Sequence, residues 1–102
     1  MSVKELTSKQ RAYLRSLANR LKPVVFVGVG GVTDEVVRSV EEAFNSRELL
    51  KVKVLQGAPE KARPTAASLM AALKDVQIPQ TIGRTIVLYR PFPEDPEIEL
   101  PG

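Results

Sequence analysis

The chain has 102 residues, 43% of them apolar and 26% charged, which is typical of one small globular domain with a single core. Because it contains neither cysteine nor histidine, disulfides, zinc sites built on those residues, thiolate nucleophiles and a Ser-His-Asp triad are excluded. Residues 1–90 hold all 15 basic and 8 acidic residues, a balance of +7, whereas residues 91–102 hold 4 acidic and no basic residues, so a polyanion is the favoured partner.

The first half of the sequence predicts a helix, a strand and a second helix. Thr7 and Gln10 have the spacing of a capping box, and Pro23 ends the helix that follows. Residues 24–27 predict a strand that is buried on both faces. Thr33 is the expected N-cap of the second helix. The apolar stripes of the two helices comprise Leu14, Leu17, Ala18 and Leu21, then Val36, Val37, Val40, Ala43 and Phe44.

The second half predicts a strand, a helix and two further strands. Residues 48–55 alternate, with Leu50, Val52 and Val54 on one face and Lys51 and Lys53 on the other. Pro64 is expected at the first position of the third helix. Its core stripe comprises Ala66, Leu69, Met70 and Leu73. A weak edge strand over 76–82, which contains Pro79, turns at Gly83 and Arg84 into a strong strand over 85–90.

This order predicts a single α/β domain, α-β-α-β-α-β-β, in which three helices pack on a four-stranded mixed sheet. Right-handed crossovers give the first three strands one direction, and the last two strands form an antiparallel hairpin. Residues 28–31, residues 56–63 and the Gly83-Arg84 turn should therefore meet at one edge of the sheet. The first helix should bring Lys9 and Arg11 nearer to residues 28–31 than Lys22.

A glycine loop formed by Gly28, Val29, Gly30 and Gly31 separates the first strand from the second helix. Glycines and free amides at a helix start suit a phosphate, although a tight turn alone would explain the same pattern. The dinucleotide fingerprint would need glycine in place of Thr33, and the G-x-x-x-x-G-K-[ST] pattern is absent, so a nucleotide-binding enzyme is disfavoured. We expect Gly31→Asp to weaken RNA binding with little effect on thermal stability.

The other residue types favour backbone recognition over catalysis. Each cation alone is best explained as solvated surface, but Lys61, Arg63 and Arg84 together suit a phosphate backbone near the predicted edge. Aromatic residues are few, and Phe26 and Phe44 are expected in the core, so structured RNA should be recognised by backbone and shape rather than by base stacking. No set of residues supplies a base, a nucleophile and a metal ligand together, so we predict no enzyme, no cofactor, no metal and no small-molecule substrate.

Five motifs occur in a fixed order: KQRAYLR at 9–15, LKP at 21–23, GxxG at 28–31, LLKVK at 49–53 and GRTIVLYR at 83–90. Residues 5–91 thereby resemble the CRM domain (chloroplast RNA splicing and ribosome maturation) in its bacterial YhbY-like form. The resemblance implies a fold similar to the C-terminal domain of translation initiation factor three. It also implies a non-enzymatic assembly factor that binds structured ribosomal RNA in a large-subunit precursor.

The same resemblance implies which residues contact RNA. Many family members have a basic or polar residue between the glycines, where this chain has Val29 and Gly30, so the loop should contribute amides rather than side-chain charge. The expected RNA-binding residues are Gly28, Val29, Gly30, Gly31, Lys9, Arg11, Arg15, Lys22, Lys51, Lys53 and Arg84.

The sequence also predicts the domain bounds, the location and the oligomeric state of the protein. We expect an RNA-binding domain over 1–91 and an acidic, proline-rich tail over 92–102 that is kept apart from the contact surface. The sequence has no apolar run near the ~20 residues that span a bilayer and no hydrophobic signal segment, which predicts a cytoplasmic protein with no membrane partner. Pro79 on an edge strand favours a monomer. The alternative function is a module that docks on ribosomal or other proteins and contacts RNA incidentally.

Overall fold

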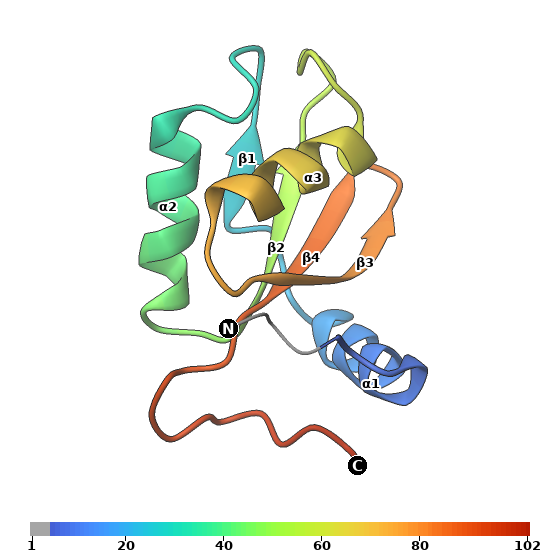
Figure 1. The fold of residues 1–102 in the computed structure, drawn as a ribbon. Helices are drawn as coiled ribbons and strands as arrows, with labels where there is room; N and C mark the ends of the chain where they lie inside the picture. The colour runs from blue at the N-terminus through green and yellow to red at the C-terminus, as the bar shows by residue number, and fades with distance from the viewer. Residues whose placement is uncertain (1–4) are drawn as a thin grey trace.

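The structure is a computed structural model that describes residues 5–102, and its elements follow the predicted order. Figure 1 shows three helices and one twisted sheet. The helices are α1 (Ser8–Ala18), α2 (Asp34–Phe44) and α3 (Ala62–Ala72). The strands are β1 (Val25–Val27), β2 (Leu49–Val54), β3 (Gln77–Ile82) and β4 (Thr85–Tyr89).

Side-chain caps fix the starts of the first two helices. The backbone N–H of Gln10 donates to Thr7 Oγ1 at 3.1 Å, and the backbone N–H of Thr7 donates to Gln10 Oε1 at 3.0 Å. The predicted capping box is therefore confirmed. Thr33 Oγ1 accepts from Val36 N at 3.2 Å and caps α2 as predicted. The third helix is present, but its predicted start was wrong, because the helix begins at Ala62 and Pro64 is its third residue. Proline fits there since first-turn amides have no partner within a helix.

The sheet has the strand order β1-β2-β4-β3. β1 pairs with β2 in parallel, and β4 lies antiparallel to both β2 and β3, so β1, β2 and β3 share one direction as predicted. β3 is an edge strand whose register shifts between Gln77 and Gln80, where Pro79 interrupts the ladder. The glycine loop, the β2–α3 loop and the β3–β4 turn consequently all lie at the upper end of the sheet in Figure 1.

The two faces of the sheet are covered by different parts of the chain. Leu50, Val52 and Val54 of β2 belong to the main core with α2 and α3, as the alternation predicts. On the opposite face, Leu49, Val87 and Tyr89 pack against Leu14 and Ala18 of α1 and against the tail (residues 92–102). Four residues that the sequence patterns assign to buried positions lie outside these clusters and are exposed: Leu17 (36%), Val24 (41%), Met70 (48%) and Phe26 (52%).

The exposure of Phe26 follows from where α1 lies. β1 has alternating burial, with Val25 and Val27 inside and Phe26 outside, so the predicted burial on both faces was wrong. α1 packs against β3 and β2 rather than against β1. Its first turn therefore lies beside β3, the strand farthest from β1, and the expectation that Lys9 and Arg11 lie nearer the glycine loop than Lys22 was also wrong.

A buried carboxylate attaches the tail to the domain. Glu48, only 2% exposed, accepts hydrogen bonds from the backbone amides of Phe92 (2.7 Å), Glu97 (2.9 Å) and Ile98 (2.7 Å). Gln10 Nε2 donates to the Pro101 carbonyl at 3.0 Å. These contacts hold the tail at the end of the sheet opposite the glycine loop (Figure 1).

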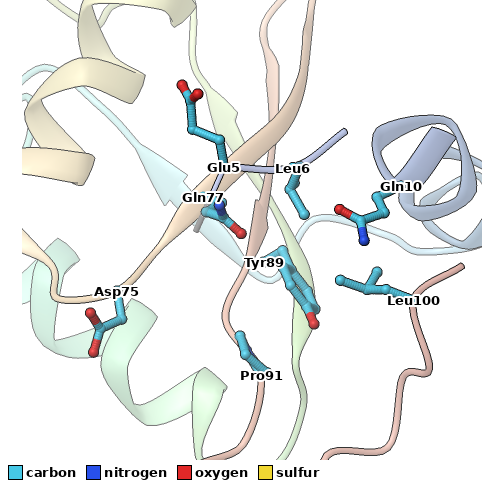
Figure 2. Close-up of a pocket in the computed structure, with 8 residues that line it drawn as sticks. All are labelled: Glu5, Leu6, Gln10, Asp75, Gln77, Tyr89, Pro91 and Leu100. Carbon is cyan, nitrogen blue, oxygen red and sulfur yellow. The ribbon is translucent and has the colours of Figure 1, made fainter. Parts of the chain in front are cut away.

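The tail and the start of α1 also enclose a small hollow. Figure 2 shows Leu100 beside the ring of Tyr89, with Gln10 above it. Burial, and secondarily the carboxylate of Glu48, raises the pKa of Tyr89 above its usual value of 10.0. Within residues 5–102, no helix is both long and apolar enough to cross a membrane.

Candidate nucleic-acid interface

The glycine loop is a tight turn at the carboxyl end of β1. Gly31 N donates to the Gly28 carbonyl at 3.0 Å, and Gly31 has φ +68°, a conformation that L side chains rarely adopt. A Cβ at Gly31 would lie 3.2 Å from Pro59 Cγ. The turn therefore requires glycine at this position, as the tight-turn explanation of the pattern predicts.

The tip of this loop is open to an approaching chain. Val29 is 81% exposed, and its amide and that of Gly30 have no hydrogen-bond partner among residues 5–102. Free amides at the start of a helix are suited to an anion. The loop side chains themselves carry no charge, so cations must come from other elements.

One such cation lies in a row of residues that crosses all four strands on the face away from α2 and α3. Phe26 pairs with Lys53, Lys53 with Thr85, and Thr85 with Ile82. We call these four residues the open row, because α1 and the tail cover only the rows nearer the opposite end of the sheet. Lys51 lies on the same face two residues before Lys53. These lysines are the only charged residues in the four strands.

Arg84 lies in the β3–β4 turn, at the upper end of the sheet. The Arg84 carbonyl accepts from Val54 N at 2.7 Å, which places the β3–β4 turn beside the end of β2. A hollow of about 440 Å³ opens between this turn and the β2–α3 loop, and its charged lining residues are Lys61, Arg84 and Glu60. The structure thus brings Arg84, Lys61 and Lys53 to one end of the sheet.

The cations of α1 are divided by the geometry of the helix. Gln10 and Leu17 contact the tail side, at Pro101 and near Ile98. Arg11 and Arg15, one turn apart, lie on the other side of the helix, and Arg11 lines a hollow with Gln77 and Ile78 at the β3 edge of the sheet. Lys9 lies opposite Ala18, on the outer side, and is not brought to the others. Lys22 lies in the segment that leads from α1 into β1.

These cations are free to bind an external anion. Within residues 5–102 the only ion pair joins Arg90 to Glu41, at 2.6 Å between the guanidinium and the carboxylate. The Arg90 guanidinium also lies 4.6 Å from the centre of the Phe44 ring, so Arg90 has a structural role. None of Lys9, Arg11, Arg15, Lys22, Lys51, Lys53 and Arg84 has a carboxylate partner in the described part of the chain.

The charges around the glycine loop favour one direction of approach. On the side of α2 and α3, a hollow beside Gly30 and Gly31 is lined by Asp34 and Glu60. On the other side, the strands contain no acidic residue and present Lys53. A phosphate chain would be repelled on the first side and attracted on the second.

Sequence reasoning missed the place of Phe26 in this surface. The run Val24 to Val27 is apolar throughout, and nothing in it distinguishes a strand that is covered on both faces from an edge strand that is covered on one. The strand order and the position of α1 decide the matter, and both depend on contacts between distant segments.

Comparisons with known proteins agree with this architecture. Residues 6–90 match the model of the CRS1 / YhbY (CRM) domain. The chain is 46% identical over 96 residues to the probable RNA-binding protein YqeI of Bacillus subtilis, covering 94% of this chain and 99% of that one. It is 41% identical over 96 residues to an RNA-binding protein of Haemophilus influenzae, covering 94% and 95%.

A solved structure extends the comparison to the fold. The solution structure of hypothetical protein SAV1595 from Staphylococcus aureus, for which RNA binding has been suggested, superposes with a TM-score of 0.78. The two chains are 39% identical, and the match covers 95% of this chain and all of the other. By sequence and by fold, the chain belongs to the CRS1 / YhbY (CRM) domain family.

Proposed function

We propose that this protein binds structured ribosomal RNA in a precursor of the large ribosomal subunit and acts in the cytoplasm, as a monomer, in ribosome assembly without catalysing a reaction. The proposed contacts are the glycine loop, Arg11, Arg15, Lys22, Lys51, Lys53 and Arg84, whereas Lys9, on the outer side of α1, lies outside the proposed surface. The tail stays outside this surface.

The observation that carries the proposal is the end of the sheet at which the glycine loop, Lys53 and Arg84 lie, with Lys51 on the same face as Lys53. Free loop amides and cations that have no ion-pair partner among residues 5–102 lie together there, and the adjacent strands contain no acidic residue. Lysine and arginine that have no protein partner gain most from phosphate, because phosphate binding releases the counterions condensed on RNA. Relatives that are named as RNA-binding proteins and that match almost the whole chain support RNA as the polyanion.

Crosslinking in cells tests the proposal directly. The protein is crosslinked to RNA, and both the RNA positions and the crosslinked residues are mapped. We expect crosslinks in large-subunit ribosomal RNA and at the glycine loop, β2 and the β3–β4 turn. Crosslinks confined to residues of α2, α3 or the tail would contradict the proposed surface.

Sedimentation with ribosomal particles tests the alternative of docking on proteins. We expect co-sedimentation with large-subunit precursors that nuclease treatment abolishes. A triple variant of Lys51, Lys53 and Arg84 to alanine should lose it as well. The matched control changes Arg38, Arg47 and Lys74, exposed cations away from this face, to alanine. Co-sedimentation that survives both nuclease and the first triple variant would support a protein partner instead.

A further inference from the structure

The open row contains an aromatic ring that the proposed function has not used. Phe26 is 52% exposed although it is flanked along β1 by Val25 and Val27, which are buried. An exposed phenylalanine leaves apolar surface area in water, so its ring contributes little to the stability of the domain. Its ring lies at the edge of a face that α1 leaves uncovered.

The neighbours of Phe26 suit a nucleotide better than an apolar partner. Lys53 is its direct partner across the β1–β2 pair, so the two Cα atoms lie about 4.8 Å apart. Lys51 lies on the same face two residues before Lys53. A protein with an apolar docking surface would have to bury both lysines without any carboxylate from this chain, at a large cost in desolvation. A base with its phosphate matches the ring and the cations together.

The row is also continuous with the glycine loop. Phe26 precedes Gly28 by two residues, about 7 Å along the strand. An RNA chain whose phosphates contact the loop amides therefore has Phe26 within reach of an adjacent nucleotide. A base inside a duplex cannot present its face to the ring, whereas an unpaired base can.

We propose that Phe26 stacks against one unpaired base of the bound RNA, next to a phosphate held by Lys53. The inference rests on the proposed function and narrows its ligand to structured RNA with an unpaired nucleotide beside the contact. It differs from the sequence-based expectation that base stacking plays no part, which placed Phe26 in the core although this residue is 52% exposed.

The test uses the full-length protein and two RNA probes of equal length. One is a hairpin whose loop carries a single 2-aminopurine, and the other is a fully paired duplex. On binding the hairpin, the native protein should quench or shift the 2-aminopurine fluorescence through stacking. Phe26→Ala should remove this signal and weaken hairpin binding about 5- to 150-fold, since stacking contributes 1–3 kcal/mol per base. Duplex affinity should change less than about twofold.

Three further variants separate stacking from folding and from general apolar contact. Phe26→Trp should retain the signal, whereas Phe26→Leu, which keeps apolar area but has no ring, should lose it. Met70→Ala, an exposed apolar residue on α3, is the control and should change neither signal nor affinity. Thermal unfolding of each variant verifies the fold.

The outcomes for the two proposals are distinct. If Phe26→Ala retains the signal and the hairpin affinity while the triple variant of Lys51, Lys53 and Arg84 loses binding, the stacking inference is wrong and the proposed function stands. If the native protein binds neither probe nor ribosomal RNA, the proposed function itself fails.

Discussion

The face of the sheet that lies away from α2 and α3 is covered at one end and open at the other. At the covered end, Leu49, Val87 and Tyr89 lie under α1 and the tail, and Glu48 holds the tail through three amides. At the open end, Phe26 and Lys53 face solvent near the glycine loop, while the half-buried Lys51 lies at the border, paired with Val87. The covered end contains apolar packing that stabilises the domain. The open end contains a lysine without an ion-pair partner among the described residues and an exposed aromatic ring. Changes at the two ends should therefore affect different properties, stability at the first and RNA binding at the second.

Loss of the Glu48 carboxylate should have the largest effect on the covered end. Glu48→Ala removes three hydrogen bonds to a buried charged group, so we expect the free energy of unfolding to fall by about 3 kcal/mol. Urea denaturation measures this change. The exposed Glu42 on α2 provides the control, and Glu42→Ala should change stability by less than about 0.5 kcal/mol. Equal stability of the two variants would show that the tail contacts contribute nothing.

The glycine loop allows a comparison of two glycines that differ only in backbone conformation and neighbours. Gly31→Ala should cost about 1–2 kcal/mol, because φ is +68° and the new Cβ meets Pro59 at 3.2 Å. Gly28→Ala meets no atom within 4 Å and should be close to neutral. Thermal unfolding should show a decrease of about 4–8 °C per kcal/mol for Gly31→Ala alone. The geometry thus revises the expectation for Gly31→Asp, which should also destabilise the fold. Identical midpoints for the two alanine variants would contradict this account.

A charge at Val29 tests the loop tip without strain, since this side chain is 81% exposed. Val29→Asp should weaken RNA binding about three- to tenfold and Val29→Lys should strengthen it by a similar factor, because each places a charge near the bound phosphates. Filter binding at fixed salt measures both, and Val29→Asn is the neutral control. Equal affinity of the aspartate and lysine variants would remove the loop tip from the interface.

The smallest effect is the pH dependence contributed by Tyr89. Its pKa is raised in the folded protein, so above pH 10 the unfolded chain releases this proton first. The stability from the neutral buried hydroxyl is fully present below pH 10 and declines as pH rises through the folded pKa. Urea midpoints at pH 8 and pH 11 should therefore differ more for the native protein than for Tyr89→Phe. An equal difference in both proteins would show that Tyr89 does not contribute.

Local patterns in the sequence predicted most of the fold. The caps at Thr7 and Thr33 and the alternation through Lys51 and Lys53 are set by residues close together in the chain, and the structure confirms them. The position of Pro64 and the exposure of Met70 depend on where α3 begins and how it turns, which short patterns define less well.

The candidate site depended more on distant contacts. The sequence placed the glycine loop and Arg84 at one edge, because strand direction follows from the connections. It did not reveal the role of Glu48, whose partners lie more than 40 residues away in the tail. It also placed Phe26 in the core, since only the strand order and the position of α1 show that β1 is covered on one face.

The dependence of RNA affinity on salt tests the central claim most directly. If about five phosphates are neutralised, the logarithm of the association constant should fall with the logarithm of salt concentration at a slope of about −4. The triple variant of Lys51, Lys53 and Arg84 should reduce this slope to about −1.5, whereas the control variant of Arg38, Arg47 and Lys74, with the same change in net charge, should leave it near −4. A native slope near zero, or equal slopes for the two variants, would contradict binding of RNA at the open end of the sheet.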